Sequence, residues 1–483
     1  MQRLAIQRIL GLLLMVFSIT MLPPMVVSLI YEDGTLMPFV YALFLTLGCG
    51  ILLWLPVRNQ RKDLRLRDGF IVVVMFWVAL GLVGTLPLTI STHPHMSFTD
   101  ALFESFSGLT TTGATVIVGL DSLPESILFY RQQLQWLGGM GIIVLAVAIL
   151  PMLGIGGMQL YRAETPGPMK DNKLTPRITE TAKALWYIYL GLTIACAIAY
   201  WAAGMTWFDA ICHSFSTVAI GGFSPYDASL GHFDSAMIEM VAIVFMILAG
   251  INFSLHFLAW RSYSVAPYRA DEECRTYIKI LFFASVITTG YLLLTQTYSS
   301  TPDALRDGLF HVVSIGTTTG FTTTEFHNWP GFLPALLLLV SFIGGCAGST
   351  GGGMKVIRVL LLFKQGTREV IRLIHPSAQV PVKLGGTPLN ERVMQAVWGF
   401  FSLYVVALCI MALALAATGL DLVTAFSAVA ACMNNLGPGL GDVGANYASI
   451  NDIAKWILCF AMLLGRLEIF TLLVLLSPAF WRN

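Results

Sequence analysis

The sequence predicts an all-α integral membrane protein built from four repeats of span, re-entrant helix and span, with two additional transmembrane helices in front. Three observations lead to this fold class. First, 56% of the 483 residues are hydrophobic and only 11% are charged, less than half of the roughly 25% charged residues of a soluble protein. Second, apolar stretches near the ~20 residues that cross hydrocarbon recur throughout the chain. Third, four shorter pieces between them share a glycine-containing ending.

Net charge and cysteine content argue against nucleic-acid binding, metal binding by cysteine, and disulfide bonds. The net charge is only +1 at pH 7, so no basic excess predicts a nucleic-acid partner. The eight cysteines include no CxxC pair. Cys274 lies in a polar loop, and the other seven are interpreted as small packing residues rather than metal ligands or disulfides.

The apolar stretches give ten candidate spans, at 9–30, 37–57, 69–91, 127–150, 183–204, 236–260, 277–297, 331–362, 393–418 and 453–476. The first follows Arg3 and Arg8 as a signal peptide would, but it is long enough to span and no small-x-small cleavage site follows it. We therefore expect a retained first helix. Four shorter pieces, each suited to a re-entrant helix, lie at 98–111, 206–219, 302–317 and 420–434.

Each short piece ends in a glycine strand, and the aligned glycines recur at intervals of 98 to 117 residues: Gly113, Gly222, Gly320 and Gly437. The chain therefore divides into two leading transmembrane helices and four pore repeats. The leading pair occupies 1–68, and repeats 1 to 4 occupy 69–182, 183–276, 277–391 and 392–483.

The distribution of basic residues orients these spans. With both termini in the cytoplasm, 24 of the 28 lysines and arginines lie on inner segments, as the positive-inside rule requires. Arg131, Arg306 and Lys455 lie outside, and Arg466 lies within a span. This orientation predicts that all four glycine strands face the extracytoplasmic side.

Four such strands around one axis predict a pore for a cation. Non-helical backbone at membrane depth must be buried in protein or line a watery cavity, and its free carbonyls can replace the hydration shell of an ion. Glycine tolerates strained angles and leaves no side chain in the pore. The short helices direct their negative ends toward the site. Ordinary helix-packing glycines would explain one copy, but not four at the same position.

The sequence resembles the potassium uptake proteins of the Trk system, within the Trk/Ktr/HKT superfamily of potassium transporters, over nearly its whole length. The most specific segments are SGLTTTGAT at 107–115, WLGGMG at 136–141, GGCAGSTGGG at 344–353 and NNLGPGL at 434–440. The resemblance implies that each filter glycine and the two residues before it supply carbonyls that bind potassium. By position these are Thr111, Thr112, Gly113, Ile220, Gly221, Gly222, Thr318, Thr319, Gly320, Asn435, Leu436 and Gly437.

Ion preference follows from the same comparison. In this family a serine at the first glycine is associated with sodium transport, and here all four glycines are intact, which favours potassium. The strands are not identical, because Ala219-Ile220 and Asn435-Leu436 replace the threonines of repeats 1 and 3. We therefore expect modest selectivity, with rubidium and some sodium also passing.

The second span of repeat 3 predicts a gate. It is broken by Gly344, Gly345, Gly348, Gly351, Gly352 and Gly353, and each glycine costs a helix about 1 kcal/mol. The spacing does not fit a nucleotide phosphate loop. An intramembrane loop at 344–353 below the glycine strands is favoured, and the resemblance implies that it is a movable gate.

Arg466 lies in the middle of the predicted last span, where an unpaired arginine is expensive. The favoured interpretation places it in the pore beside the glycine loop, as an electrostatic barrier to cations. The alternative is an ion pair with Glu468 or with a carboxylate of a neighbouring helix, although Glu468 at i+2 points to another face. Glu104, in the first short helix, either adds negative potential near the strands or caps local amides.

The predicted function is potassium uptake through a gated, ion-conducting pore, and proton-coupled symport on the same fold is the alternative. No buried acid–histidine relay is evident, which favours a channel. A membrane-embedded enzyme is a remote alternative, because His213 and His311 have no partner pattern that predicts catalysis. We expect potassium as substrate and no organic cofactor.

Partners follow from the resemblance. The basic inner loops at 151–182, 261–279 and 364–392 are by themselves explained by topology. The resemblance implies that a cytosolic, nucleotide-binding (TrkA-like) regulatory subunit docks there. It also implies a homodimer with one pore per subunit in the bacterial inner membrane, although the chain itself predicts neither NAD nor ATP binding.

Overall fold

The computed structural model describes residues 2–59, 66–144 and 178–482. These residues form a helical bundle with one two-stranded hairpin, β1 (Lys383–Leu384) and β2 (Thr387–Pro388). Within this part of the chain, six helices are long and apolar enough to cross a membrane, and two bent helix pairs bring the number of spans to as many as eight. The predicted class of helical membrane protein is confirmed.

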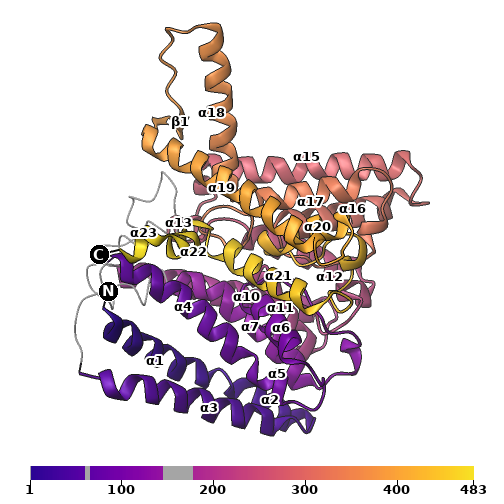
Figure 1. The fold of residues 1–483 in the computed structure, drawn as a ribbon. Coiled ribbons are helices and arrows are strands. Elements are labelled where there is room, and N and C mark those ends of the chain that lie inside the picture. The colour runs from indigo at the N-terminus through magenta and orange to yellow at the C-terminus, as the bar shows by residue number, and fades with distance from the viewer. Residues whose placement is uncertain (1, 60–65, 145–177, 483) are drawn as a thin grey trace.

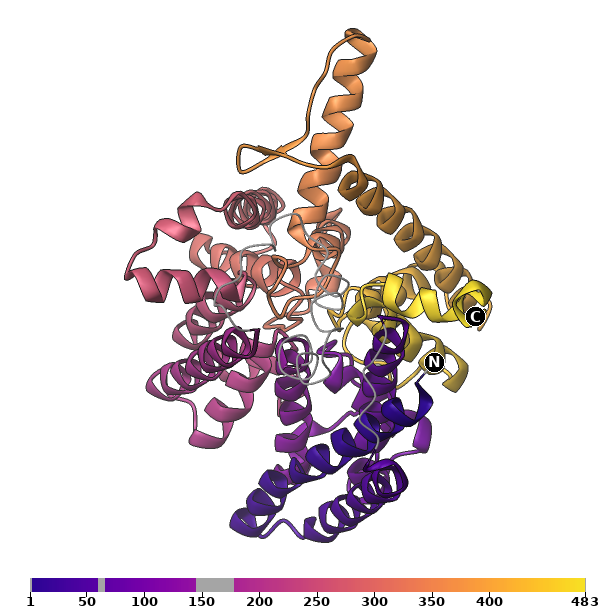
Figure 2. The same ribbon diagram turned by 90° about the vertical axis from the view of Figure 1, so that its left-hand side faces the viewer.

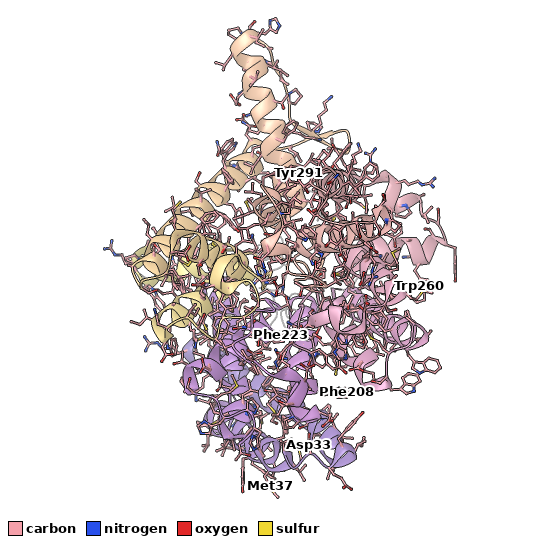
Figure 3. All side chains as sticks on the ribbon, turned by 90° about the vertical axis from the view of Figure 1, so that its right-hand side faces the viewer. Asp33, Met37, Phe208, Phe223, Trp260 and Tyr291 are labelled. Atoms are coloured by element: carbon pink, nitrogen blue, oxygen red, sulfur yellow. The ribbon has the colours of Figure 1, made fainter. Side chains whose placement is uncertain are left out.

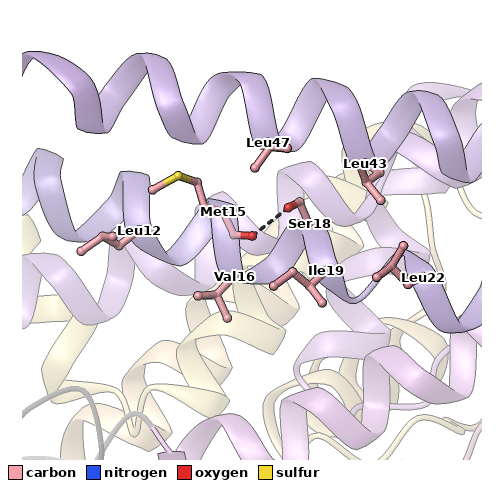
Figure 4. Close-up of a pocket in the computed structure, with 8 residues that line it drawn as sticks. All are labelled: Leu12, Met15, Val16, Ser18, Ile19, Leu22, Leu43 and Leu47. Carbon is pink, nitrogen blue, oxygen red and sulfur yellow. Dashed lines mark hydrogen bonds between the residues drawn. The ribbon is translucent and has the colours of Figure 1, made fainter.

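The leading pair packs at one side of the bundle (Figure 1). It consists of α1 (Arg3–Ile19), α2 (Leu22–Tyr31) and α3 (Leu36–Trp54), and η1 (Leu55–Val57) follows. A Cβ on Gly11 would approach the backbone oxygen of Gly50 to 2.8 Å, so α1 and α3 come as close as small residues permit. Between these helices lies an apolar pocket of about 360 Å³, lined by residues such as Leu12 and Leu43 (Figure 4).

Each repeat contributes a short helix close to its predicted bounds: α6 (Phe98–Leu109), α11 (Trp207–Ala219), α16 (Thr301–Gly316) and α20 (Leu422–Met433). Local sequence explains where each begins. The side chains of Ser97, Thr206, Ser300 and Asp421 accept hydrogen bonds from backbone N–H groups of the first helical turn. Such N-caps satisfy donors that the helix itself leaves free.

Further helices stand before and after each short helix. Those before are α4 (Leu66–Gly84) with α5 (Leu86–Ile90), α10 (Ile178–Ala202), α15 (Glu272–Leu294) and α19 (Glu391–Ala416). Those after begin with α7 (Glu125–Val144), α12 (Ala236–Ala249), α17 (Leu333–Ile343) and α21 (Asp452–Arg466). A short 3₁₀ turn precedes each of the latter: η2 (Leu120–Ser122), η4 (Ser229–Phe233), η5 (Phe326–Asn328) and η6 (Gly441–Val443). Figure 2 shows the repeats in sequence order around a common centre.

The candidate spans at 236–260 and 453–476 are each formed by two helices with a sharp bend between them. α12 meets α13 (Phe253–Ser262) at 95°, and α21 meets α22 (Phe470–Leu476) at 118°. Asn252 caps α13 with its side chain, and Glu468 and Ile469 have φ angles of 55° and 59°, which no α-helix accommodates. Part of the predicted span at 127–150 lies outside the described residues, as do Arg162, Lys170, Lys173 and Arg177 of the inner loop at 151–182.

The predicted break in repeat 3 is present. α17 ends at Ile343, and α18 (Val356–Ile374) begins only after an irregular segment. α18 and the following β1–β2 hairpin project beyond the rest of the bundle (Figure 1). The remaining short helices are α14 (Ala266–Ala270), before α15, and α23 (Pro478–Trp481), at the end of the chain.

Candidate functional site

The four short helices end in the same hydrogen-bond pattern. In α6 the N–H of Thr112 donates to the carbonyl of Ser107 at 2.8 Å, and the N–H of Thr111 donates to Gly108 at 2.9 Å. Corresponding bonds join Gly221 to Ser216, Thr319 to Ser314 and Leu436 to Ala431, at 2.7–2.8 Å. This is the Schellman ending, in which one residue takes a left-handed conformation. It turns the chain sharply into the glycine strand, defined as 110–113, 219–222, 317–320 or 434–437.

The left-handed residue is strained in three of the four strands. Thr111, Ile220 and Thr318 have φ angles of 54°, 54° and 70°, which β-branched residues rarely adopt. Asn435, with φ of 54°, tolerates this conformation better. Strain of about 1–3 kcal/mol per residue persists only where the surrounding structure enforces it, and it concentrates at functional sites.

Backbone conformation alternates along each glycine strand. We call Gly113, Gly222, Gly320 and Gly437 the ring glycines. The left-handed residue and the ring glycine two positions later both have positive φ, and the residue between them does not. In a regular extended chain successive carbonyls point to opposite sides, whereas this alternation turns them toward one side. Each strand can therefore present a row of carbonyl oxygens to a common axis.

The four ring glycines close a circuit. A Cβ on Gly113, Gly222 or Gly320 would collide with the carbonyl oxygen of Gly221, Thr319 or Leu436, respectively, in the next repeat. A Cβ on Gly437 would lie 2.8 Å from the carbonyl oxygen of Thr112, in the first repeat. Eight of the twelve residues predicted to bind the ion take part in these contacts, and the other four directly precede them in the chain. We expected glycine to keep side chains out of the pore, but its Cβ would instead strike the neighbouring strand.

Two strands are braced by their own hydroxyl groups. The Oγ1 atoms of Thr110 and Thr112 lie 2.8 Å apart, and those of Thr317 and Thr319 lie 2.7 Å apart. All four side chains are fully buried. Repeats 1 and 3 therefore carry an internal hydrogen bond between residues i and i+2 of the strand.

The strands of repeats 2 and 4 are held from outside. In repeat 2, Nε2 of Gln135 on α7 donates to the carbonyl of Gly221 at 2.6 Å, and its Oε1 accepts from the N–H of Phe223 at 3.0 Å. In repeat 4, the Asn434 side chain donates to the Ser341 hydroxyl at 2.9 Å and accepts from the Tyr404 hydroxyl. Sequence reasoning missed these residues, although a glutamine within an apolar span was a usable signal.

Glu104, for which the sequence left two roles open, accepts hydrogen bonds from one backbone amide, one hydroxyl group and one guanidinium. Its carboxylate accepts hydrogen bonds at 3.1 Å from the Thr115 hydroxyl and the Val116 N–H, and at 2.7 Å from Arg131 Nε. Both members of this ion pair are buried. Arg131 also donates to the carbonyl of Ser224, so the pair ties the segments that leave the first two glycine strands.

His213 and His311 occupy the position of Glu104 in their own repeats, nine residues before the ring glycine. Nε2 of His213 lies 3.0 Å from the Ser224 hydroxyl, and Nε2 of His311 accepts from the N–H of Thr323 at 3.4 Å. Both histidines thus contact the segment after the strand, His213 through a side-chain hydroxyl and His311 through a backbone N–H. This geometry gives them a structural role and lends no support to the enzyme alternative.

The glycine-rich segment at 344–353 lies against the glycine strands. The N–H of Gly352 donates to the Thr318 hydroxyl at 2.7 Å, and that of Gly353 donates to the carbonyl of Asn434 at 3.0 Å. The Thr350 hydroxyl donates to the carbonyl of Val218 at 2.9 Å. The segment therefore contacts the short-helix ends of repeats 2, 3 and 4. Gly344, Gly348 and Gly353 have positive φ.

Arg466 joins three repeats. It terminates α21 rather than lying within a continuous helix, which corrects the sequence expectation. Its Nη1 donates to the carbonyl of Thr350 at 3.2 Å and its Nη2 to that of Gly138 at 2.9 Å. Repeats 1 and 3 are opposite members of the circuit, so the side chain crosses between them. The alternative pair with Glu468 is not formed, because Glu468 pairs with Arg358.

Comparison with known proteins gives consistent matches. Residues 35–483 match the family described as TrkH, cation transport protein. The chain is 61% identical to the Trk system potassium uptake protein TrkH of Vibrio parahaemolyticus, with both chains covered completely. It is 43% identical to TrkG of Escherichia coli, with 98% of this chain and 97% of that one covered. It also superposes on the crystal structure of the potassium transporter TrkH from Vibrio parahaemolyticus with a TM-score of 0.92, at 58% identity and with both chains fully covered.

Proposed function

Because this chain belongs to the TrkH family of cation transport proteins, we propose that it takes up potassium across the bacterial inner membrane through a gated, ion-conducting pore. Membership of a cation-transport family assigns the chain to transport rather than to enzymatic catalysis. The observation that carries the proposal is the closed circuit of four ring glycines, each beside a carbonyl of the next strand. Backbone carbonyls around an axis can replace the water of a potassium ion.

The proposed filter comprises the two residues before each ring glycine and the glycine itself. Its carbonyls carry partial negative charge, and the four short helices add the negative ends of their dipoles. Neither feature supplies a fixed full charge, which suits an ion that must both enter and leave. Four non-identical strands support modest selectivity, with rubidium and some sodium passing.

The proposed gate lies on the inner side of this filter and consists of the segment at 344–353 and Arg466. A positive side chain that crosses between opposite repeats raises the energy of a cation on the same path. Six glycines give the loop the backbone freedom to rearrange. Opening then requires Arg466 to release the carbonyls of Gly138 and Thr350.

The proposed assembly is a homodimer with both termini in the cytoplasm. We propose that a TrkA-like, nucleotide-binding regulatory subunit docks on the basic inner face. The name "Trk system" of the relatives and the projection of α18 beyond the bundle (Figure 1) support this assignment. Copurification of the full chain with a soluble partner tests it.

A reversal-potential measurement in planar bilayers tests the function. With opposed potassium and proton gradients, we expect the reversal potential of the full chain to follow potassium alone. A value that shifts with the proton gradient would establish coupled symport instead. The absence of any potassium-dependent flux through purified, membrane-inserted protein would reject the proposal.

A further inference from the structure

Among the described residues, two buried side chains donate to a proposed filter carbonyl: Tyr447 to that of Gly437 at 2.7 Å, and Gln135 to that of Gly221 at 2.6 Å. Gln135 lies on α7, in repeat 1, but both ends of its amide bond the backbone of repeat 2. Because Oε1 accepts from the N–H of Phe223, the other end must be the donor to the carbonyl of Gly221. The two hydrogen bonds therefore fix the orientation of the amide.

Repeat 2 lacks the brace that repeats 1 and 3 possess. Where those strands have threonine pairs, it has Ala219 and Gly221, which offer no hydroxyl group. Ile220 between them is held at φ of 54°, a conformation that an isoleucine adopts only under constraint. An external hydrogen bond is required to hold this strand in place.

The contact is specific in shape as well. A Cβ on Gly221 would strike the amide group of Gln135, so the side chain packs directly on the backbone of this glycine. The carbonyl of Gly221 also lies against Gly113 in the circuit. Gln135 thus sets the position of the oxygen at which repeats 1 and 2 meet.

A second α7 residue supports the same backbone. Arg131, one helical turn before Gln135, donates to the carbonyl of Ser224 at 3.1 Å, and its guanidinium lies 4.2 Å from the centre of the Phe223 ring. Phe223 itself lies deep in the bundle (Figure 3). Two side chains of α7 therefore hold residues 221–224, and of these only Gln135 contacts the carbonyl that immediately precedes the ring glycine.

We infer that Gln135 is a positioning residue that sets potassium over sodium selectivity by holding the Gly221 carbonyl from outside the pore. This inference rests on the proposed function. Among the described residues, the equivalent carbonyls of Thr112, Thr319 and Leu436 accept no hydrogen bond from the protein. A released Gly221 carbonyl can move inward toward a smaller ion, so that sodium is bound with less penalty.

The test compares Gln135→Met with Gln132→Met in proteoliposomes that contain the full chain. The matched control is informative because Gln132 is equally buried on the same helix, yet neither end of its amide has a hydrogen-bond partner within the described residues. The readout is rubidium uptake in competition with potassium or sodium. The selectivity ratio is the inhibitory concentration of sodium divided by that of potassium. For Gln135→Met we expect this ratio to fall roughly three- to tenfold, the effect of one lost hydrogen bond, and for Gln132→Met to stay unchanged.

Gln135→Glu, assayed at a pH where its carboxyl is ionised, provides a second measurement, because a carboxylate retains the acceptor for Phe223 and has no donor for Gly221. We expect it to lose selectivity like Gln135→Met, and it keeps the inference testable if that variant fails to reach the membrane. An unchanged ratio in either variant, with normal wild-type uptake, overturns the role of Gln135. Wild-type protein that takes up no rubidium would instead refute the proposed function.

Discussion

The glycine strands of repeats 1 and 3 each contain an internal hydrogen bond between side chains, whereas those of repeats 2 and 4 lack one and are bonded by side chains from other helices. In the first pair, hydroxyl groups two residues apart bond each other at 2.7–2.8 Å. In the second pair, Gln135, Tyr404 and Ser341 supply the hydrogen bonds. One fold thus meets the same backbone requirement in two ways.

The difference shows how a single chain can depart from fourfold symmetry without losing the circuit. A homotetramer must use one sequence for every strand, but fused repeats can vary. Their ring glycines have little room for variation in this chain, because each one faces a carbonyl of the next strand. The bracing residues can vary more, because buried polar groups need only some partner with good geometry.

Substitution of the ring glycines breaks the circuit itself and has the largest expected effect. Gly113→Ala, Gly222→Ala and Gly320→Ala each force a Cβ into a neighbouring carbonyl at positive φ. We expect potassium uptake by these variants to be abolished in cells that lack other uptake systems. Gly437→Ala should retain more activity, because its nearest contact is 2.8 Å. Equal loss of uptake in all four variants would contradict this ranking of the glycines by the closeness of their contacts.

Arg466→Ala tests the proposed gate independently of the four glycine strands. The side chain donates to the carbonyls of Gly138 and Thr350 but contacts no ring glycine. We therefore expect rubidium flux to rise severalfold, since removal of two charge-assisted hydrogen bonds of about 1.5–3 kcal/mol each favours opening. The selectivity for potassium over sodium in the competition assay should stay constant. Unchanged or lower flux at normal expression would count against a barrier role.

Tyr404→Phe probes an externally braced strand. It removes the donor to the Asn434 amide oxygen and leaves that buried acceptor with a penalty of about 1–3 kcal/mol. We expect lower selectivity for potassium over sodium in competition assays and a lower unfolding temperature. Ser341→Ala should act on the same amide. A double-mutant cycle that shows simple additivity would argue against a shared brace.

Two threonine substitutions compare the self-braced strands with each other. Thr112→Val and Thr319→Val each remove one internal hydroxyl pair, worth about 1 kcal/mol. Thr112 also accepts a hydrogen bond from Asn435 at 3.0 Å, which links repeat 1 to repeat 4. We therefore expect Thr112→Val to lower selectivity more than Thr319→Val, in the same competition assay. The reverse order would show that the link to Asn435 has no role.

Asp33 contacts none of the four glycine strands in the hydrogen bonds described for it, and its substitution serves as a control for selectivity. We expect it to have the smallest effect of the substitutions considered. Burial raises the pKa of the Asp33 carboxyl, but hydrogen bonds from Ser28, Ser126 and Thr35 outweigh this and lower the pKa to about 2. Its contribution to stability is therefore present above the unfolded pKa, near 4, and is lost as the pH falls toward 2. Asp33→Asn should flatten the pH dependence of the unfolding temperature in this window and leave selectivity unchanged.

The sequence predicted the short helices well because their signals are local. A capping residue begins each one, and glycine ends the strand that follows, so α6 and α20 lie within about two residues of the predicted pieces at 98–111 and 420–434. The bends at 250–252 and 467–469 were not predicted. Both lie in apolar runs whose composition suits a continuous helix, and only contacts with the rest of the bundle determine where such a helix breaks.

By itself, the sequence determined the membrane class, the fourfold recurrence, the ring glycines and the broken span of repeat 3, since each depends on composition or on spacing along the chain. Tertiary structure decided which side chains support which strand. Gln135 precedes the carbonyl of Gly221 by 86 residues, and Arg466 follows that of Gly138 by 328 residues. Hydrogen bonds across such separations depend on helix packing, because a buried donor takes whichever acceptor the assembled bundle places within reach.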